Sequence, residues 1–146
     1  MTIALVLGPV SCGETSDGGA TVPNCGLPTR EPGVDDSLVP DLYLPDEALL
    51  TRAQRERGGF LAQINVELGV QDALRYYRRA VQDAGYEIIQ SDNEGFEAEL
   101  YLRKDEMLAA VQIRTSQCDD ESIVFVNEVD AARLGGNLPS PSPKQT

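Results

Sequence analysis

The sequence predicts an α+β fold in which an antiparallel sheet of about five or six strands is covered on one face by a single amphipathic helix. One segment has apolar residues at spacings of three and four, which is the period of a helix. The segments around it alternate apolar and polar residues with a period of two, which indicates strands with one solvated face. The predicted order along the chain is ββ-α-ββββ.

The first predicted hairpin lies within residues 48–68. It joins the strand ALLTRAQ to the strand AQINVEL through the turn-like sequence RERGG. The second strand alternates apolar residues with the polar residues Gln63, Asn65 and Glu67. We expect the apolar side chains to face the core and the polar ones to face solvent.

The helix is predicted within GVQDALRYYRRAVQDAG, residues 69–85, and is about four turns long. Its apolar residues form one stripe, made of Val70, Ala73, Leu74, Tyr77, Val81 and Ala84. Gly69 is a suitable N-cap, and the negative charge of Asp72 is favourable in the first turn. Gly85 fits the left-handed conformation that ends many helices.

Four further strands are predicted after the helix. Their sequences are YEIIQS, FEAELYL, LAAVQIRT and SIVFVNEV. Between them, SDNEG and RKDE have the composition and length of hairpin turns. In FEAELYL the polar face carries Glu97, Glu99 and Tyr101, which we expect to be solvated together with the polar face of AQINVEL.

These periodicities are confined to residues 41–130, which we predict to form the α+β domain. Residues 13–40 and 131–146 are rich in small and polar residues and proline, with few apolar residues to bury. We therefore interpret residues 13–40 as a flexible tether and residues 131–146 as a disordered tail rich in proline and serine. Residues 1–12 are interpreted as a truncated signal segment.

The composition disfavours nucleic acid as a partner and removes several classes of catalytic site. The 146 residues include 24 acidic and 12 basic ones, so the net charge of −12 repels a phosphate backbone. Histidine is absent, which excludes Ser-His-Asp triads, Cys-His pairs and histidine metal sites. The glycine motifs that bind phosphates and dinucleotides are absent as well. We therefore predict no enzyme, no cofactor and no metal site.

An apolar run ends at Cys12. The run is far shorter than the ~20 residues of a membrane-spanning helix, but an export signal contains such a run followed by a small-residue cleavage site. Val10, Ser11 and Cys12 resemble the last three positions of a bacterial lipobox, whereas Pro9 stands where leucine is usual and a basic start is missing. We expect Cys12 to be acylated, which would anchor the chain in a membrane. The alternative is a buried or free cysteine.

If Cys12 is acylated, Cys25 and Cys118 remain as a pair. In an oxidising compartment we expect them to form a disulfide between the tether and the loop TSQCDDES. The alternative is two free thiols in a cytosolic protein. None of the three cysteines has the C-x-x-C spacing of a redox or zinc site.

Basic residues on the polar face of the helix are a candidate partner-binding surface. They are Arg75, Arg78 and Arg79, with Tyr76 beside them. The alternative is a solvated helix face supported by neighbouring acidic residues. The acidic sequences SDNEG and CDDES contain oxygen ligands but lack the spacing of a calcium loop, so we interpret them as solvated turns.

Taken together, VSCG, the tether and the domain of 90 residues, 41–130, resemble the small secreted lipoproteins of bacteria, particularly the high-GC Gram-positive (actinobacterial) ones. The central VELGVQDALRYYRRAVQDAGYEII is similar to a recurrent motif of their α+β domains. The resemblance implies a location on the extracytoplasmic face of the cell membrane and supplies no catalytic residue.

The predicted function is a non-enzymatic, lipid-anchored domain of the cell envelope that binds an unidentified envelope protein or helps to assemble one. Either the solvated sheet face or the helix arginines would make the contact. One alternative is a small carboxylate-based enzyme or ligand-binding domain with a pocket between helix and sheet. Another is a cytosolic interaction domain.

Overall fold

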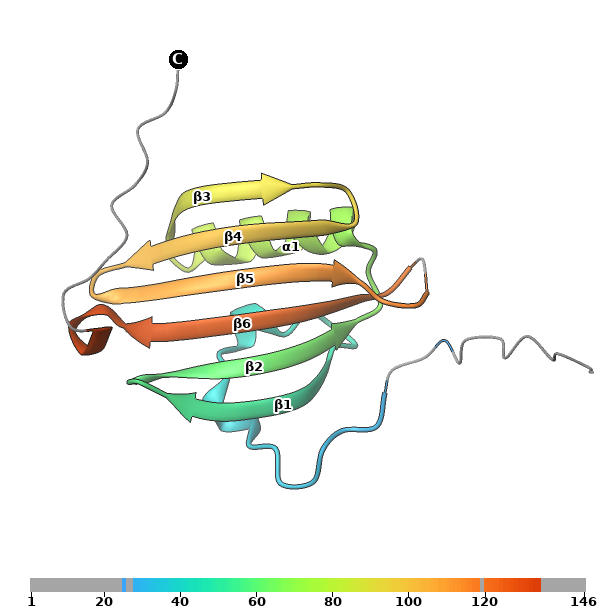
Figure 1. Cartoon of the computed structure of the whole chain (residues 1–146), viewed down its shortest axis with the longest axis horizontal. Coiled ribbons are helices and arrows are strands. Elements are labelled where there is room, and N and C mark those ends of the chain that lie inside the picture. Colours follow the sequence, from blue (N-terminus) through green and yellow to red (C-terminus); the bar gives the residue numbers. More distant parts are fainter. Residues whose placement is uncertain (1–24, 26–27, 119, 135–146) are drawn as a thin grey trace, which may run out of the picture.

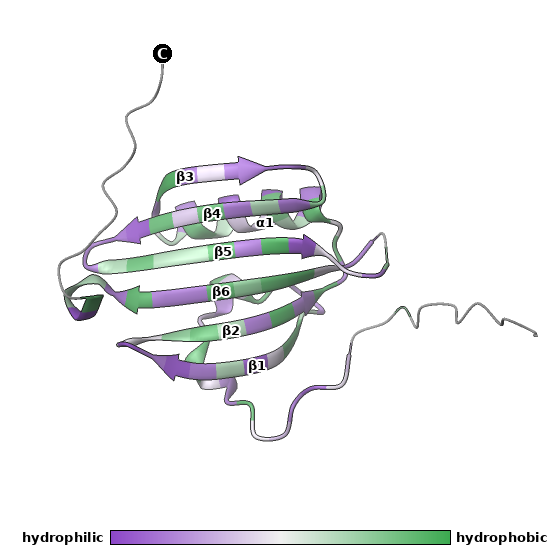
Figure 2. Cartoon of the chain, viewed as in Figure 1, coloured by the Kyte–Doolittle hydropathy of each residue, from purple (hydrophilic) through white to green (hydrophobic). Residues whose placement is uncertain are grey.

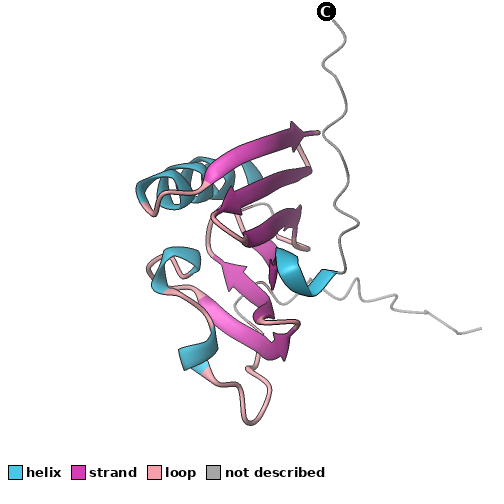
Figure 3. Cartoon of the chain, turned by 90° about the vertical axis from the view of Figure 1, so that its left-hand side faces the viewer, coloured by secondary structure: helices cyan, strands magenta, loops and turns pink. Residues whose placement is uncertain are grey.

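A six-stranded sheet carries one α-helix and two short 3₁₀ helices on the same face (Figures 1 and 3). The structure, a computed structural model, describes residue 25, residues 28–118 and residues 120–134. Its elements are η1 (Asp36–Leu38), η2 (Asp41–Tyr43), β1 (Leu49–Glu56), β2 (Gly59–Val66), α1 (Val70–Asp83), β3 (Glu87–Asn93), β4 (Glu97–Lys104), β5 (Met107–Thr115), β6 (Ser122–Asp130) and η3 (Ala131–Leu134).

The strand order across the sheet is β1-β2-β6-β5-β4-β3, and all neighbouring strands are antiparallel. The strands β3 to β6 form a meander that returns from one edge of the sheet to β2. Helix α1 therefore carries the chain from β2, next to one edge of the sheet, to β3 at the opposite edge. The predicted α+β fold class and the order ββ-α-ββββ are confirmed.

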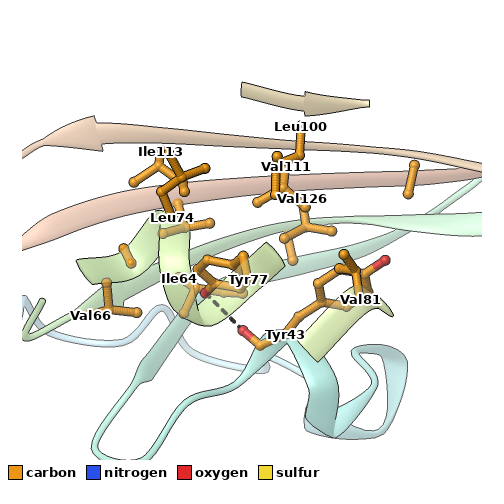
Figure 4. Packing of buried hydrophobic residues seen from close by; sticks show 14 of the residues in the cluster. Tyr43, Ile64, Val66, Leu74, Tyr77, Val81, Leu100, Val111, Ile113 and Val126 are labelled. Atoms are coloured by element: carbon orange, nitrogen blue, oxygen red, sulfur yellow. Dashed lines mark hydrogen bonds between the residues drawn. The ribbon is translucent and has the colours of Figure 1, made fainter. Parts of the chain in front are cut away.

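Helix α1 buries the predicted apolar stripe against β3, β4 and β5. Its buried residues are Val70, Ala73, Leu74, Tyr77 and Val81. Figure 4 shows several of these side chains meeting the apolar side chains of the sheet, among them Leu100 and Val111. The helix begins after Gly69 and ends before Gly85, whose φ of +85° is the left-handed conformation that glycine adopts without strain.

The packed part of the chain begins earlier than the predicted boundary at residue 41. Val39 is buried in the core, and Val34 and Leu38 pack against it. Arg30 forms an ion pair with Asp36, and the backbone N–H of Glu31 donates a hydrogen bond to Thr51 of β1. Although this segment is mostly polar, its few apolar side chains pack against the core and hold the segment on the sheet. The N-terminal residues 1–24 of the predicted signal and tether lie outside the described residues.

Hydrophobic and hydrophilic residues alternate along the strands (Figure 2), and their burial alternates in step, so that one face of the sheet is buried and the other is open. The rows facing α1, η1 and η2 contain fully buried residues such as Ile64, Leu100, Ile113 and Val124. Figure 1 looks onto the opposite face, with α1 behind β3 and β4, and the edge-on view of Figure 3 shows all of α1, η1 and η2 on one side. No helix among the described residues is both long and apolar enough to span a membrane.

Strand β2 approaches β6 so closely at Gly59 that no side chain fits there. A Cβ atom at this position would lie 1.9 Å from the carbonyl oxygen of Glu128. The preceding turn residues Arg57 and Gly58 both have positive φ, the conformation that two-residue hairpins between twisted strands favour. The RERGG sequence thus supplies both the hairpin turn and the close contact between β2 and β6.

Cys25 and Cys118 form a disulfide bond, with their Cα atoms 5.7 Å apart. Cys118 lies in the loop between β5 and β6, so the bond joins the N-terminal segment to one end of the central strands. The cysteines are 93 residues apart in sequence, and closing a loop of this length removes much of the conformational freedom of the unfolded chain.

We predict that the double variant Cys25→Ser/Cys118→Ser lowers the free energy of unfolding by about 2–4 kcal/mol. Urea unfolding followed by circular dichroism measures the change. Cys12→Ala is the matched control and leaves the unfolding midpoint in place. Equal midpoints for the double variant and the unmodified chain would contradict the prediction.

Candidate functional site

The buried carboxylate of Glu128 is the first candidate site. Strand β6 places it on the helix-covered face, in register with Ala109 of β5 and Phe60 of β2. The residue is only 9% exposed, and its Oε2 atom accepts hydrogen bonds from the hydroxyls of Tyr43 at 3.1 Å and Tyr86 at 2.7 Å. Glu128 forms no ion pair among the described residues.

Tyrosine hydrogen bonds connect Glu128 to the layer formed by α1, η1 and η2, here called the covering layer. Tyr77 of α1 donates a hydrogen bond of 3.0 Å to the backbone carbonyl of Tyr43 in η2 (Figure 4). Burial raises the pKa of Tyr43 and Tyr77 far above the usual value for tyrosine. Burial and the hydrogen bond to Glu128 raise the pKa of Tyr86 to about 12. All three hydroxyls are therefore neutral donors at physiological pH.

Glu128, Tyr43, Tyr77 and Tyr86 form a cluster of hydrogen-bonded residues that holds the covering layer on the sheet. Each buried side-chain nitrogen and oxygen of the described residues has a hydrogen-bond partner, so no group in this layer points unpaired at a missing ligand. The predicted alternative of a carboxylate pocket between helix and sheet would need space beside Glu128. The two surface depressions described below are lined by other residues and lie elsewhere.

The open face of the sheet holds the second candidate site. A shallow depression of about 320 Å³, here called the Ala110 hollow, is lined by Leu61, Glu99, Tyr101, Ala110, Gln112, Phe125 and Asn127. The register places Ala110 between Tyr101 of β4 and Asn127 of β6, next to the pair formed by Gln112 and Phe125. A small residue surrounded by larger ones leaves a gap in the surface, so Ala110 is the reason for the hollow.

Hydrogen bonds fix the polar side chains at the edge of the hollow. The amide of Gln112 donates to Glu97 at 2.8 Å and to Glu99 at 2.7 Å. Tyr101 donates its hydroxyl to the other oxygen of Glu99 at 3.0 Å, and this hydrogen bond raises the pKa of Tyr101. Arg114 pairs with Glu97 at 3.0 Å. The rim is thus an ordered network in which Glu99 has only neutral donors.

A second, smaller depression of about 170 Å³ adjoins the hollow at Glu99. It is lined by Asp92, Asn93, Glu94, Glu97, Ala98 and Glu99. The predicted turn SDNEG forms its outer side, where the side-chain oxygen of Asn93 accepts hydrogen bonds from the backbone of Gly95 and the side chain of Gln71. Among the described residues no group of three or more acidic or cysteine side chains is placed to hold a metal ion.

The helix arginines are exposed and mostly engaged with neighbours. Arg75 pairs with Asp72, and Arg79 with Asp83 at 3.9 Å. Arg78 donates a hydrogen bond to Ser91 of β3. Arg75 and Arg79 thus have acidic neighbours, whereas Arg78 is bonded to a neutral hydroxyl, and ion pairs between such exposed side chains contribute little to stability.

The other predicted residues divide between surface and core. Tyr76 is half-buried, and its ring meets Tyr77 edge-on with centroids 5.2 Å apart. Burial and the negative charge of Asp46 raise the pKa of Tyr76. Asn65, which we expect on the solvated face, is only 7% exposed and lies beside Thr51 of β1. Cys12 lies outside the described residues.

Comparison with known proteins finds no matching family model, no similar curated protein and no similar solved structure. The candidate sites are therefore interpreted from their own geometry.

Sequence reasoning missed the apolar part of the hollow. Leu61, Ala110 and Phe125 lie in or beside predicted strands. The predicted solvated face, however, consists only of the polar residues of AQINVEL and FEAELYL, so it contains none of these three. A signal existed in SIVFV, where apolar residues occupy both faces of β6. Such a run indicates a strand that is shielded on both sides, and Ile123 and Phe125 are indeed half-buried on the open face.

We predict that stability falls in alkali. Because the pKa of Tyr86 rises from 10.0 to about 12 on folding, the stability contributed by its neutral hydroxyl is complete below pH 10 and is lost as the pH rises to about 12. Urea unfolding at several pH values, with tyrosinate absorbance in parallel, measures this loss. Tyr86→Phe should show a shallower decline than the unmodified chain. An identical decline in both would contradict the assigned role of Tyr86.

Proposed function

We propose that this protein is a non-enzymatic, lipid-anchored domain of the cell envelope that binds another envelope protein through the open face of its sheet. The Ala110 hollow is the observation that carries the binding role. It combines apolar side chains with an ordered polar rim on the face of the sheet opposite α1, η1 and η2. A half-buried Phe125 and a Tyr101 that is 38% exposed are the kinds of residue that act as anchors in protein interfaces.

The open face supports this role better than the helix arginines do. Its side chains stand on central strands of a paired sheet, so little conformational entropy is lost when a partner binds. On the helix, Arg75 and Arg79 are paired with acidic neighbours. Tyr76, the aromatic residue next to them, is turned partly into the protein.

The disulfide supports an extracytoplasmic location, because such bonds persist in oxidising compartments. It also defines the geometry of the proposed anchor. Thirteen residue steps separate Cys12 from Cys25, which is a reach of at most about 45 Å. A lipid on Cys12 would thus keep the Cys118 end of the sheet within that distance of the membrane. Because an anionic membrane surface repels an acidic domain, attachment to a membrane would require such an anchor rather than surface charge.

We predict that Cys12→Ala releases the protein from the membrane of the native host. Intact-mass analysis of the membrane fraction should show that the unmodified chain begins at Cys12 and carries the added mass of its acyl chains, whereas the variant carries no acyl mass and is recovered in the soluble fraction. Because two or more acyl chains are needed for stable anchoring, the added mass on Cys12 should correspond to more than one. Equal masses and equal solubility would refute the anchor.

The binding role is tested by replacing Phe125 with a photoreactive phenylalanine analogue in the native host. We expect a discrete protein adduct from position 125 and none from the same analogue at Gln82, an exposed position of α1. Adding Ala110→Trp should abolish the adduct, since the indole fills the hollow. Adducts from position 82 alone, or adducts that survive Ala110→Trp, would refute the open face as the contact.

A further inference from the structure

We infer that the partner segment bound by the Ala110 hollow is a basic polypeptide with an aliphatic or aromatic anchor side chain. This inference rests on the proposed binding role of the open face and adds the chemistry of the partner. It is carried by an apolar hollow that adjoins a strip of unpaired carboxylates on the same face of the sheet.

The hollow suits an apolar side chain. Its volume of about 320 Å³ lies at the lower end of the range of about 300–1,000 Å³ that is typical of ligand sites. Leu61, Ala110 and Phe125 come from three different strands, β2, β5 and β6, and the ring of Tyr101 from β4 adds a fourth side. Burying a large aliphatic or aromatic side chain against these groups removes apolar area from water on both partners.

The rim beside the hollow suits a cation. Asp92, Glu94 and Glu99, here called the acidic strip, take part in no ion pair among the described residues. Glu99 lines both the hollow and the adjoining smaller depression, so the acidic strip and the apolar surface are continuous.

The pairing of β3 with β4 brings two carboxylates of the acidic strip together. Asp92 of β3 lies directly opposite Glu99 of β4. Like charges at directly opposite positions destabilise a sheet, and neither carboxylate forms an ion pair with a described cation. A lysine or arginine of a partner placed between them would remove an unfavourable interaction as well as add a favourable one. An anionic partner would be repelled by these two carboxylates, and a neutral oligosaccharide would leave their mutual repulsion unchanged.

The test measures the fluorescence anisotropy of labelled synthetic peptides with the full-length chain carrying Cys12→Ala. The probe is a peptide of alternating lysine and leucine. Its controls are a peptide with glutamate in place of lysine and one with serine in place of leucine. We expect the lysine-leucine peptide to bind at least about tenfold more tightly than either control, and its affinity to fall as salt screens the charges.

Variants assign the binding to the hollow and the acidic strip. Ala110→Trp should weaken the lysine-leucine peptide by about tenfold or more, and Tyr101→Ala, at an exposed position, should also weaken it. Glu99→Gln keeps the shape of the rim and should weaken binding by about threefold. Gln82→Trp and Glu106→Gln are matched controls at exposed positions away from the face, and both should bind as the unmodified chain does. Circular dichroism checks that each variant is folded.

Two results would overturn the inference. One is lysine-leucine binding that is insensitive to both Ala110→Trp and Tyr101→Ala, or no such binding at all. The other is binding of the glutamate peptide, or of a neutral hexasaccharide, that depends on Ala110 and is at least as tight as that of the lysine-leucine peptide.

The photocrosslinking result at position 125 is independent of peptide chemistry. Its success together with failure of the basic peptide would reject the partner chemistry alone, whereas its failure would reject the binding role itself.

Discussion

A connected set of tyrosine hydrogen bonds fastens the covering layer to the sheet and ends on the buried carboxylate of Glu128. Tyr77 binds the backbone of Tyr43, and Tyr43 and Tyr86 both bind Glu128. The contacts join α1, η2 and the segment before β3 to the central strand β6. A buried carboxylate without donors is costly, and so is a buried hydroxyl without an acceptor. Each group is therefore held in place by the others, and the helix has one position on the sheet.

The open face follows from where the described helices lie. Among the described residues, α1 with its 14 residues and the two short 3₁₀ helices η1 and η2 shield one face of the sheet, and the opposite face carries polar side chains that remain in water. Within that polar surface, Leu61, Ala110 and Phe125 form an apolar interruption on paired central strands. The same fold thus supplies a paired sheet and a hollow in its surface, which together are the physical basis of the proposed binding.

Charge and anchoring complement each other in the proposed role. Several acidic residues at the rim of the sheet are matched by arginines, as in the pairs of Glu31 with Arg52 and Glu87 with Arg103. The acidic strip beside the hollow is unmatched among the described residues. An acidic domain is repelled by an anionic membrane, while a short segment between Cys12 and the disulfide would keep it close. The open face would then be presented near the membrane without adhering to it.

The sequence predicts the helix and the six strands, because helix and strand periods and the capping Gly85 are local signals. It also predicts that Cys25 pairs with Cys118 if Cys12 is acylated. It does not predict η1 in the expected tether, nor that Asp92 and Asn93 of the expected turn belong to β3. That Tyr43 and Tyr86 supply the donors for Glu128, and that β6 lies between β2 and β5, is established by the folded arrangement alone. The hollow likewise exists only once four strands are in register. A local pattern determines which way a side chain faces, whereas its neighbours depend on pairings between distant segments.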